Sequence, residues 1–205
     1  MTSAAPRRSP PYPPTAPVVA LAASAGGLQV LGEVLAGLPV DLGAAILIVQ
    51  HLDPNRPSHL AEILARRSGF PVKQVKAHDH LECGVAYVAP PDAHLTVDRV
   101  GDLTLSQGPR VHYVRPSADN LFESVAQNFG ARAIAVVLTG MGVDGASGAL
   151  SVKLHGGTVI VQDEATSAFF GMPGAAIAAG LVDRILPLSK IPGEITALVA
   201  LQAGS

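Results

Sequence analysis

Three residues whose side chains can perform acyl transfer each follow an apolar run of strand length. Ser24 follows VVALAA, His51 follows AAILIVQ, and Asp144 follows AIAVVLTGMGV. Runs of this kind, bounded by glycine, proline and polar residues, are typical of strands buried in a parallel sheet. Open α/β sheets form their sites beyond the carboxyl ends of the strands. We therefore expect a serine, a histidine and an aspartate at one edge of one sheet.

This set of side chains is the one that serine-nucleophile acyl transfer requires. A serine hydroxyl is a weak nucleophile and needs an adjacent base. Histidine suits that role because an ordinary imidazole titrates near neutral pH. A carboxylate then orients the imidazole and stabilises its charged form. On this hypothesis Ser24 attacks a carbonyl, His51 takes its proton and Asp144 orients His51, with no metal or organic cofactor.

Simpler interpretations exist for the serine and the histidine. Ser24 precedes Gly26 and Gly27 in a turn that matches the G-x-S-x-G nucleophile elbow only in part, because Ala22 stands where a glycine is expected. Taken alone, Ser24 is better explained as the N-cap of the following helix. His51 is one of seven histidines and could be an ordinary residue at a strand end.

The loop at 140–145 has a stronger rival interpretation. It matches G-x-G-x-x-G between a predicted strand and a predicted helix, and Asp163 is the acidic residue about 20 positions on that a dinucleotide site requires. A pyrophosphate would bind at the helix N-terminus, where the Asp144 carboxylate would repel it and compete for its donors. We therefore prefer a role for Asp144 toward His51, with a backbone N–H near Met141 facing a developing oxyanion.

Other reactive side chains have weaker support. His78 and His80 flank Asp79, but no second cluster completes a metal site, so we interpret this segment as a solvated loop. Cys83 is the single cysteine, which excludes an intrachain disulfide and favours a reducing compartment. We interpret it as a small packed thiol.

The elements that must position these residues form one α/β domain. The chain has 205 residues, of which 48% are apolar and 15% are charged, as suits strands buried on both faces. The pattern predicts a mostly parallel, doubly wound sheet flanked by helices, with an inserted antiparallel β-hairpin. Ser58 and Ser117 are predicted helix N-caps, with helix ends at Gly69 and Gly130. The predicted strands are 18–22, 44–50, 85–89, 133–138, 158–162 and 181–186, the hairpin strands are 94–98 and 103–106, one helix ends at Leu154, and the last begins near Pro192.

The ends and the charge of the chain limit its partners. Six of the first 17 residues are proline, which predicts a disordered leader over 1–17 before a domain over 18–205. The net charge of −2 and the absence of any long Lys/Arg run argue against nucleic acid as a partner. No window is long and apolar enough for a spanning helix. We expect a cytoplasmic protein that does not insert into a membrane.

The same residues lie in motifs that resemble the catalytic domain of the CheB-type chemotaxis methylesterases, the protein-glutamate methylesterases. The resemblance covers nearly all of the chain after residue 17. It implies a triad of Ser24, His51 and Asp144, with the Met141 N–H as an oxyanion donor. The motifs are ASAGG at 23–27, VQH at 49–51, YVAPPDAH at 87–94, VRPSADNLFESVA at 114–126, LTGMGVDGA at 138–146 and GMPGAA at 171–176.

The resemblance also implies a reaction and its partners. Methyl esters on glutamate side chains in the cytoplasmic helices of methyl-accepting chemoreceptors are hydrolysed to glutamate and methanol, and some members deamidate receptor glutamines. The family usually carries an N-terminal receiver domain that gates the site, whereas a short leader precedes the first strand here. We therefore expect constitutive activity or a regulator acting in trans, in flagellar chemotaxis or another chemosensory pathway.

Two departures and two alternatives stay open at this point. Ala22 and Ala25 replace a glycine and, often, a hydroxyl residue beside the nucleophile, which affects the geometry expected for the loop. The first alternative is a dinucleotide-binding protein that uses the loop at 140–145. The second is a receptor-binding adaptor that keeps the fold without turnover.

Overall fold

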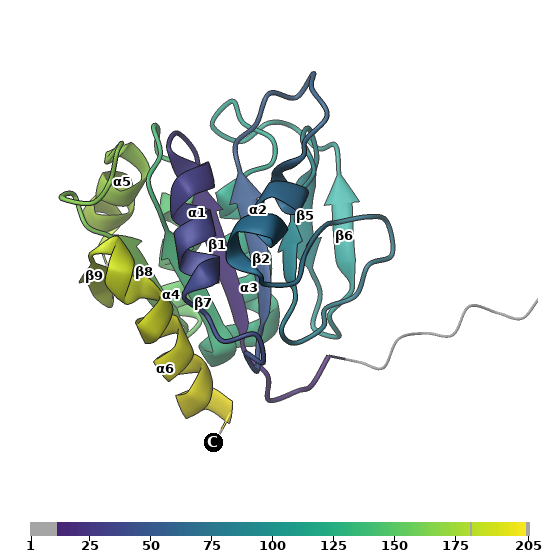
Figure 1. The fold of residues 1–205 in the computed structure, drawn as a ribbon. Coiled ribbons are helices and arrows are strands. Elements are labelled where there is room, and N and C mark those ends of the chain that lie inside the picture. Colours follow the sequence, from purple (N-terminus) through teal and green to yellow (C-terminus); the bar gives the residue numbers. More distant parts are fainter. Residues whose placement is uncertain (1–11, 181, 204–205) are drawn as a thin grey trace, which may run out of the picture.

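Parallel strands form one central sheet in the computed structural model, which describes residues 12–180 and 182–203 (Figure 1). The strands lie in the order β3-β4-β2-β1-β7-β8-β9, and every neighbouring pair is parallel. The order reverses beside β1, where the chain returns with β7, and open α/β sheets form their sites at such a point. The strand bounds are β1 (Val18–Ala23), β2 (Ala45–Gln50), β3 (Val72–Gln74), β4 (Ala86–Val88), β7 (Ala133–Val137), β8 (Thr158–Gln162) and β9 (Arg184–Leu186).

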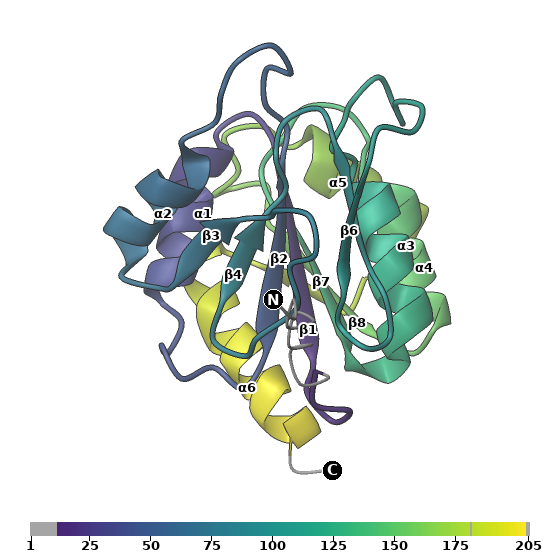
Figure 2. The ribbon, with the colours of Figure 1, turned by 90° about the vertical axis from the view of Figure 1, so that its right-hand side faces the viewer.

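Helices cover both faces of this sheet, as the edge-on view in Figure 2 shows. The helices α1, α2 and α6 lie over one face, and α3, α4 and α5 lie over the other. The helix bounds are α1 (Gly27–Ala36), α2 (Leu60–Ser68), α3 (Ala118–Phe129), α4 (Ala146–Leu154), α5 (Gly171–Ala179) and α6 (Ile191–Ala203), with short 3₁₀ helices η1 (Gly130–Arg132) and η2 (Leu188–Lys190).

The central strand β1 is buried along its whole length. Val19 and Leu21 belong to the core beneath α1, α2 and α6, whereas Val18 and Ala20 belong to the core beneath α3 and α4. A strand with two buried faces needs apolar side chains on both, so its sequence is a continuous apolar run rather than an alternating one. The predicted doubly wound parallel sheet is therefore confirmed.

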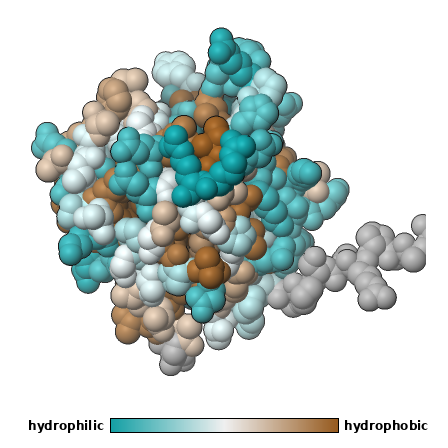
Figure 3. Space-filling model, viewed as in Figure 1, coloured by the Kyte–Doolittle hydropathy of each residue, from teal (hydrophilic) through white to brown (hydrophobic). Residues whose placement is uncertain are grey.

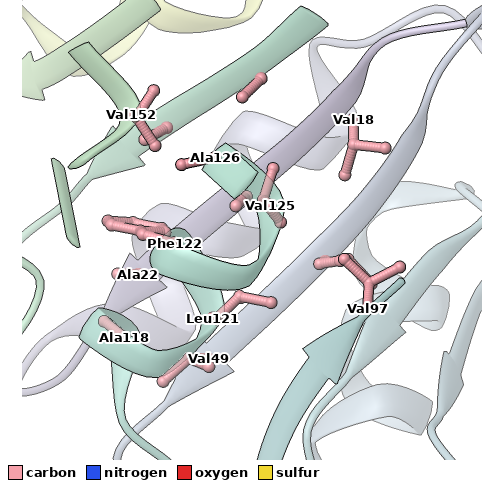
Figure 4. Close-up of a cluster of buried hydrophobic side chains, with 14 of the residues drawn as sticks. Val18, Ala22, Val49, Val97, Ala118, Leu121, Phe122, Val125, Ala126 and Val152 are labelled. Atoms are coloured by element: carbon pink, nitrogen blue, oxygen red, sulfur yellow. The ribbon is translucent and has the colours of Figure 1, made fainter. Parts of the chain in front are cut away.

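The apolar side of α3 packs against this sheet. Ser117 caps the helix as predicted, because its hydroxyl accepts the N–H of Asn120. The apolar side chains of α3 recur at intervals of three and four residues, so they lie on one face of the helix. Figure 4 shows this face in contact with side chains of the strands, and the labelled α3 residues are Ala118, Leu121, Phe122, Val125 and Ala126.

The predicted hairpin is formed by β5 (His94–Val97) and β6 (Leu103–Ser106), which pair antiparallel. It packs beside α3, and Asn128 of that helix donates a hydrogen bond to the carbonyl of Val97. The first strand stops one residue earlier than expected. The carboxylate of Asp98 accepts the N–H groups of the next turn instead, including that of Gly101.

One strand and one α-helix were not predicted from the sequence. The strand β3 has three half-buried residues, which is too short for a periodic pattern. The helix α5 consists mostly of small residues and contains Pro173, so its sequence has neither a strong helix propensity nor an amphipathic period. The predicted strand over 181–186 is shorter, since β9 begins at Arg184, and Leu181 lies outside the described residues.

The N-terminal segment joins the domain earlier than expected. Residues 1–11 of the predicted leader lie outside the described residues, but Tyr12 is buried, with 4% of its surface exposed. Its hydroxyl donates to the Pro17 carbonyl and accepts the N–H of Ala45, each at 2.7 Å. Its ring packs edge-on against Phe129, with centroids 6.1 Å apart. The expectation of disorder through residue 17 is therefore wrong for residues 12–17, because one tyrosine anchors a segment that its prolines alone would leave extended.

Polar and apolar side chains are interspersed over the face that α1, α2 and α6 cover (Figure 3). Scattered exposed apolar residues such as Val40 and Leu201 are ordinary for a protein surface. In the part of the chain that the structure describes, no helix has the length and apolar character needed to cross a membrane.

Candidate active site

The three predicted residues lie at the carboxyl ends of three adjacent strands. Ser24 directly follows β1, His51 directly follows β2, and Asp144 lies in the loop between β7 and α4. The strand β1 pairs with β2 on one side and with β7 on the other. The parallel register therefore delivers all three residues to the same edge of the sheet, at the point where the strand order reverses.

Ser24 lies in a turn that ties β1 to β7. Its N–H donates to the carbonyl of Thr139 at 3.0 Å, and its own carbonyl accepts the N–H of Gly27. The N-cap of α1 is Gly26, in the left-handed conformation with φ of 80°, and no side chain caps this helix. The interpretation of Ser24 as a helix cap is therefore wrong.

The glycine at 140 is required by close packing around Ser24. A Cβ built on Gly140 would lie 2.8 Å from the Cβ of Ser24 and would also collide with the Met172 side chain. This glycine lets the loop after β7 approach the serine. Close approach to a phosphate is not needed to explain it.

His51 bonds to Asp144 across the sheet. Its Nε2 lies 2.8 Å from Asp144 Oδ2, although 93 residues separate the two in sequence. The side chain of Asp144 is 3% exposed and that of His51 is 12% exposed. His51 is therefore more than an ordinary strand-end histidine. Among the described residues, no hydrogen bond joins Ser24 Oγ to His51, and Nδ1 is the ring nitrogen that stays unbonded.

Asp144 is held as an anion by the N-terminus of α3. Its carboxylate accepts hydrogen bonds from the Ala118 N–H at 2.6 Å, the Ser117 hydroxyl at 2.7 Å and the Asp119 N–H at 3.2 Å. Burial raises the pKa of Asp144, but the hydrogen bonds from His51, Ala118 and Ser117 outweigh it, so the pKa lies below its ordinary value. The carboxylate thus carries a fixed negative charge beside the imidazole.

A second carboxylate occupies the N-terminus of α4. Asp119 Oδ1 accepts the N–H groups of Gly145 at 3.0 Å and Gly148 at 2.7 Å, and Oδ2 lies 3.1 Å from His112 Nε2. Burial raises the pKa of Asp119 and the charge of Asp144 adds to the rise, although the bond from Gly148 opposes it. The Asp144 carboxylate, which precedes α4, accepts N–H groups at the start of α3, and the Asp119 carboxylate, in α3, accepts N–H groups at the start of α4. The two helices therefore cap each other's N-termini.

This reciprocal capping argues against the dinucleotide interpretation. The backbone N–H groups of Gly145 and Gly148, which a pyrophosphate would need, are already bound to Asp119. Asp163, the expected ribose ligand, accepts the N–H and the hydroxyl of Thr166 in a tight turn. The dinucleotide-binding alternative is therefore not supported.

The backbone N–H of Met141 is a hydrogen-bond donor for which the described residues supply no acceptor. The residue is 62% exposed. Within residues 12–180 and 182–203, its backbone N–H makes no hydrogen bond to the protein. This leaves the N–H available to a bound group.

Several supporting residues were missed in the sequence. Gln50 bonds to the carbonyls of Ser24 and His51, and the Thr139 hydroxyl contacts the carbonyl of Ala25. Ser117 was predicted only as a cap, and Asp119 was not singled out. Both lie in the segment 114–126. The signal that could have identified them is a polar residue within a stretch whose other residues were expected to be buried.

The remaining reactive side chains of the described residues form no metal site. The described residues contain no group of three or more acidic, histidine or cysteine side chains placed to hold a metal ion. His80 pairs instead with Asp102 at 2.9 Å. Cys83 is exposed, so the expectation of a packed thiol is wrong.

A cleft of about 490 Å³ opens beside Ser24, between the N-terminus of α1 and α2. Leu28, Leu52 and Ile63 give it apolar walls, and Arg67 lies among its lining residues. A site of this size, beside a serine turn, can receive a side chain of a polypeptide. The fold and site thus define an α/β domain with a serine turn, a histidine–carboxylate pair and a cleft at one edge of its sheet.

Comparison with known proteins narrows this class. The model of the CheB methylesterase family matches residues 19–195, and the chain belongs to that family. The crystal structure of the Thermotoga maritima CheB methylesterase catalytic domain superposes with a TM-score of 0.85 and 36% identity, covering 89% of this chain and 98% of that one.

Curated relatives agree with this assignment. A protein-glutamate methylesterase/protein-glutamine glutaminase of Pyrococcus horikoshii is 45% identical over 197 residues, covering 95% of this chain and 54% of the relative. Protein-glutamate methylesterase/protein-glutamine glutaminase 2 of Caulobacter vibrioides is 46% identical over 191 residues, covering 91% and 55%. The chain spans about half the length of these relatives.

Proposed function

We propose that this chain is a protein-glutamate methylesterase that hydrolyses methyl esters of glutamate side chains to glutamate and methanol. The observation that carries the proposal is the His51–Asp144 pair, joined at 2.8 Å at the sheet edge where Ser24 also lies. Membership of the CheB methylesterase family and the names of the relatives support the same reaction.

In this mechanism Ser24 is the nucleophile and His51 is the general base. Because Nε2 of His51 is bound to Asp144, Nδ1 is the nitrogen that takes the serine proton. Ser24 Oγ attacks the ester carbonyl, and His51 returns the proton to the departing methanol. A water molecule, deprotonated by His51, then attacks the acyl-enzyme and releases glutamate.

Charge stabilisation comes from the protein itself. The ionised Asp144 stabilises the imidazolium that forms when His51 takes the proton. The unpaired N–H of Met141 donates to the oxyanion of the tetrahedral intermediate. The chemistry needs no cofactor, since the base, the nucleophile and the oxyanion donor are all groups of the chain.

A second reaction follows from the same acyl-enzyme. The two relatives carry protein-glutamine glutaminase in their names. Attack of Ser24 on a glutamine carboxamide would release ammonia in place of methanol and give the same acyl-enzyme. We include deamidation of receptor glutamines in the proposal on this ground.

The substrates in this proposal are the cytoplasmic helices of methyl-accepting chemoreceptors, and the enzyme acts in the cytoplasm. The cleft beside Ser24 supports a polypeptide substrate, because it can receive a side chain next to the nucleophile. Neither nucleic acid nor membrane insertion has a role in the proposal.

Release of labelled methanol from methylated receptor fragments tests this function. We expect turnover by the wild-type chain and none by Ser24→Ala, because the hydroxyl is the attacking group. Thr15→Ala serves as the control for loss of a hydroxyl far from the sheet edge. Turnover at the wild-type rate in Ser24→Ala would dismiss the nucleophile. A folded wild-type chain that binds receptor without releasing methanol would favour the adaptor.

A further inference from the structure

Gln50 is a buried polar residue that also lines the cleft beside Ser24. It is the last residue of β2, with 6% of its surface exposed. Ile46 and Ile48 precede it by four and two residues and belong to the core beneath α1 and α2, so its side chain faces that layer. His51 reaches the opposite layer, where Asp144 is bound to α3.

The carboxamide of Gln50 joins the two residues of the proposed proton transfer. Its Nε2 donates to the carbonyl of Ser24 at 2.7 Å and to the carbonyl of His51 at 3.1 Å. Both acceptors are carbonyls, so the nitrogen must face them, and both amide hydrogens are used. The ladder between β1 and β2 ends at the pairing of Ala23 with Gln50. The side chain therefore bridges the strands one residue beyond the ladder.

The other end of the carboxamide has no donor. Among the described residues, Gln50 Oε1 is buried without a hydrogen-bond partner. It fills the space that a Cβ at Gly27 would need, directly beneath the first turn of α1. A buried acceptor without a donor costs stability. If the side chain at this position only filled space, an apolar side chain would therefore give a more stable fold.

We propose that Gln50 is a positioning residue, which holds the Ser24 turn and the His51 backbone at the separation that proton transfer requires. This inference rests on the proposed function, because it concerns the same nucleophile and base. Gln50 itself touches no reacting atom. It acts through the carbonyls of the two residues that do.

The test compares Gln50→Leu with the wild-type chain. Leucine has nearly the same volume and donates no hydrogen bond. We expect kcat for methanol release to fall about 10- to 100-fold, the loss typical of misplaced reacting groups, with KM within about twofold. The rate at which a fluorophosphonate probe labels Ser24 should fall in proportion, because labelling uses the same nucleophile and base.

Asn128→Leu is the matched control. The Asn128 carboxamide also donates to two backbone carbonyls, those of Val97 and Ser124, but it lies on α3 beside the hairpin. This variant should change kcat and the labelling rate by less than about twofold. Gln50→Met, which keeps the length of the side chain, repeats the measurement if Gln50→Leu does not fold, and the same losses are expected.

The outcomes separate this inference from the proposed function. Wild-type kcat and wild-type labelling in a folded Gln50 variant would overturn the positioning role and leave the methylesterase intact. An equal loss in Asn128→Leu would also overturn it, because the effect would then be one of general stability. If the wild-type chain releases no methanol but Gln50→Leu still slows labelling of Ser24, the substrate is wrong and the positioning role stands.

Discussion

The Asp144 carboxylate is ionised and is fixed in its orientation, and the hydrogen bonds that it accepts explain both properties. An imidazole, a hydroxyl and two backbone N–H groups converge on one carboxylate. These bonds leave the carboxylate little freedom to rotate, and they favour its ionised form. An amide at this position would keep the shape and would lose the charge.

Asp144→Asn is expected to lower kcat by about 10⁴-fold, because the amide favours the wrong imidazole tautomer. Its effect on stability should depend on pH. The pKa of Asp144 is lowered by folding, so the carboxylate stabilises the fold above its unfolded pKa of about 3.9, and this gain is lost as the pH falls through the folded pKa. Urea unfolding should separate the two proteins at pH 7, and the difference should shrink as the pH falls below the unfolded pKa. A constant difference across this range would contradict the assignment.

At the scale of elements, the site depends on how closely α3 approaches α4. Each helix binds its terminal amides to the acid of the other, which fixes the relative positions of the two N-termini. Gly148 makes this contact close, because a Cβ there would lie 2.6 Å from the Phe122 Cβ and 2.9 Å from the Asp119 backbone. The loop that carries Asp144 is thereby held against α3.

Two glycines, each the third residue of its helix, test this packing. Gly148→Ala should lower the free energy of unfolding by about 1–3 kcal/mol, because the Cβ meets backbone that cannot move aside. Gly193→Ala in α6 should raise it by about 0.5–1 kcal/mol, since a Cβ there meets nothing within 4 Å and alanine is the better helix former. Equal changes in urea unfolding would show that helix propensity alone decides both.

At the scale of the whole molecule, the N-terminal segment binds the amino ends of the strands, and the candidate site lies at their carboxyl ends. Tyr12 joins the N-terminal segment to the starts of β1 and β2, at the end of the sheet opposite the site (Figure 1). Burial raises the pKa of its hydroxyl far above the ordinary value, so the group stays protonated and can donate.

Tyr12→Phe should therefore lower the free energy of unfolding by about 1–3 kcal/mol, because the N–H of Ala45 and the carbonyl of Pro17 lose a buried partner. Urea unfolding measures this change, and kcat below the unfolding transition should stay at the wild-type value. A variant with unchanged stability would mean that water replaces the hydroxyl. A variant with lowered kcat would mean that the two ends of the sheet are coupled.

The sequence was most informative where one residue decides the local structure. The strand over 158–162 and the caps at Ser117 and Gly130 were predicted as the structure has them, because apolar runs and capping residues act locally. The pairing of Asp119 with the amides of α4 could not be predicted, since it joins residues 26 and 29 positions apart. The burial of Tyr12 depends on contacts with Phe129 and Ala45, which no local pattern reveals.

His51 and Asp144 come from opposite sides of β1, and 93 residues of chain lie between them. A fragment that retains only one half of the sheet would lack either the imidazole or the carboxylate. After dilution from denaturant, recovery of turnover should consequently appear last, once β7 has docked, and should lag behind the recovery of helical signal. Catalysis would then report the completed fold, and proteolytic pieces of this protein would be inert.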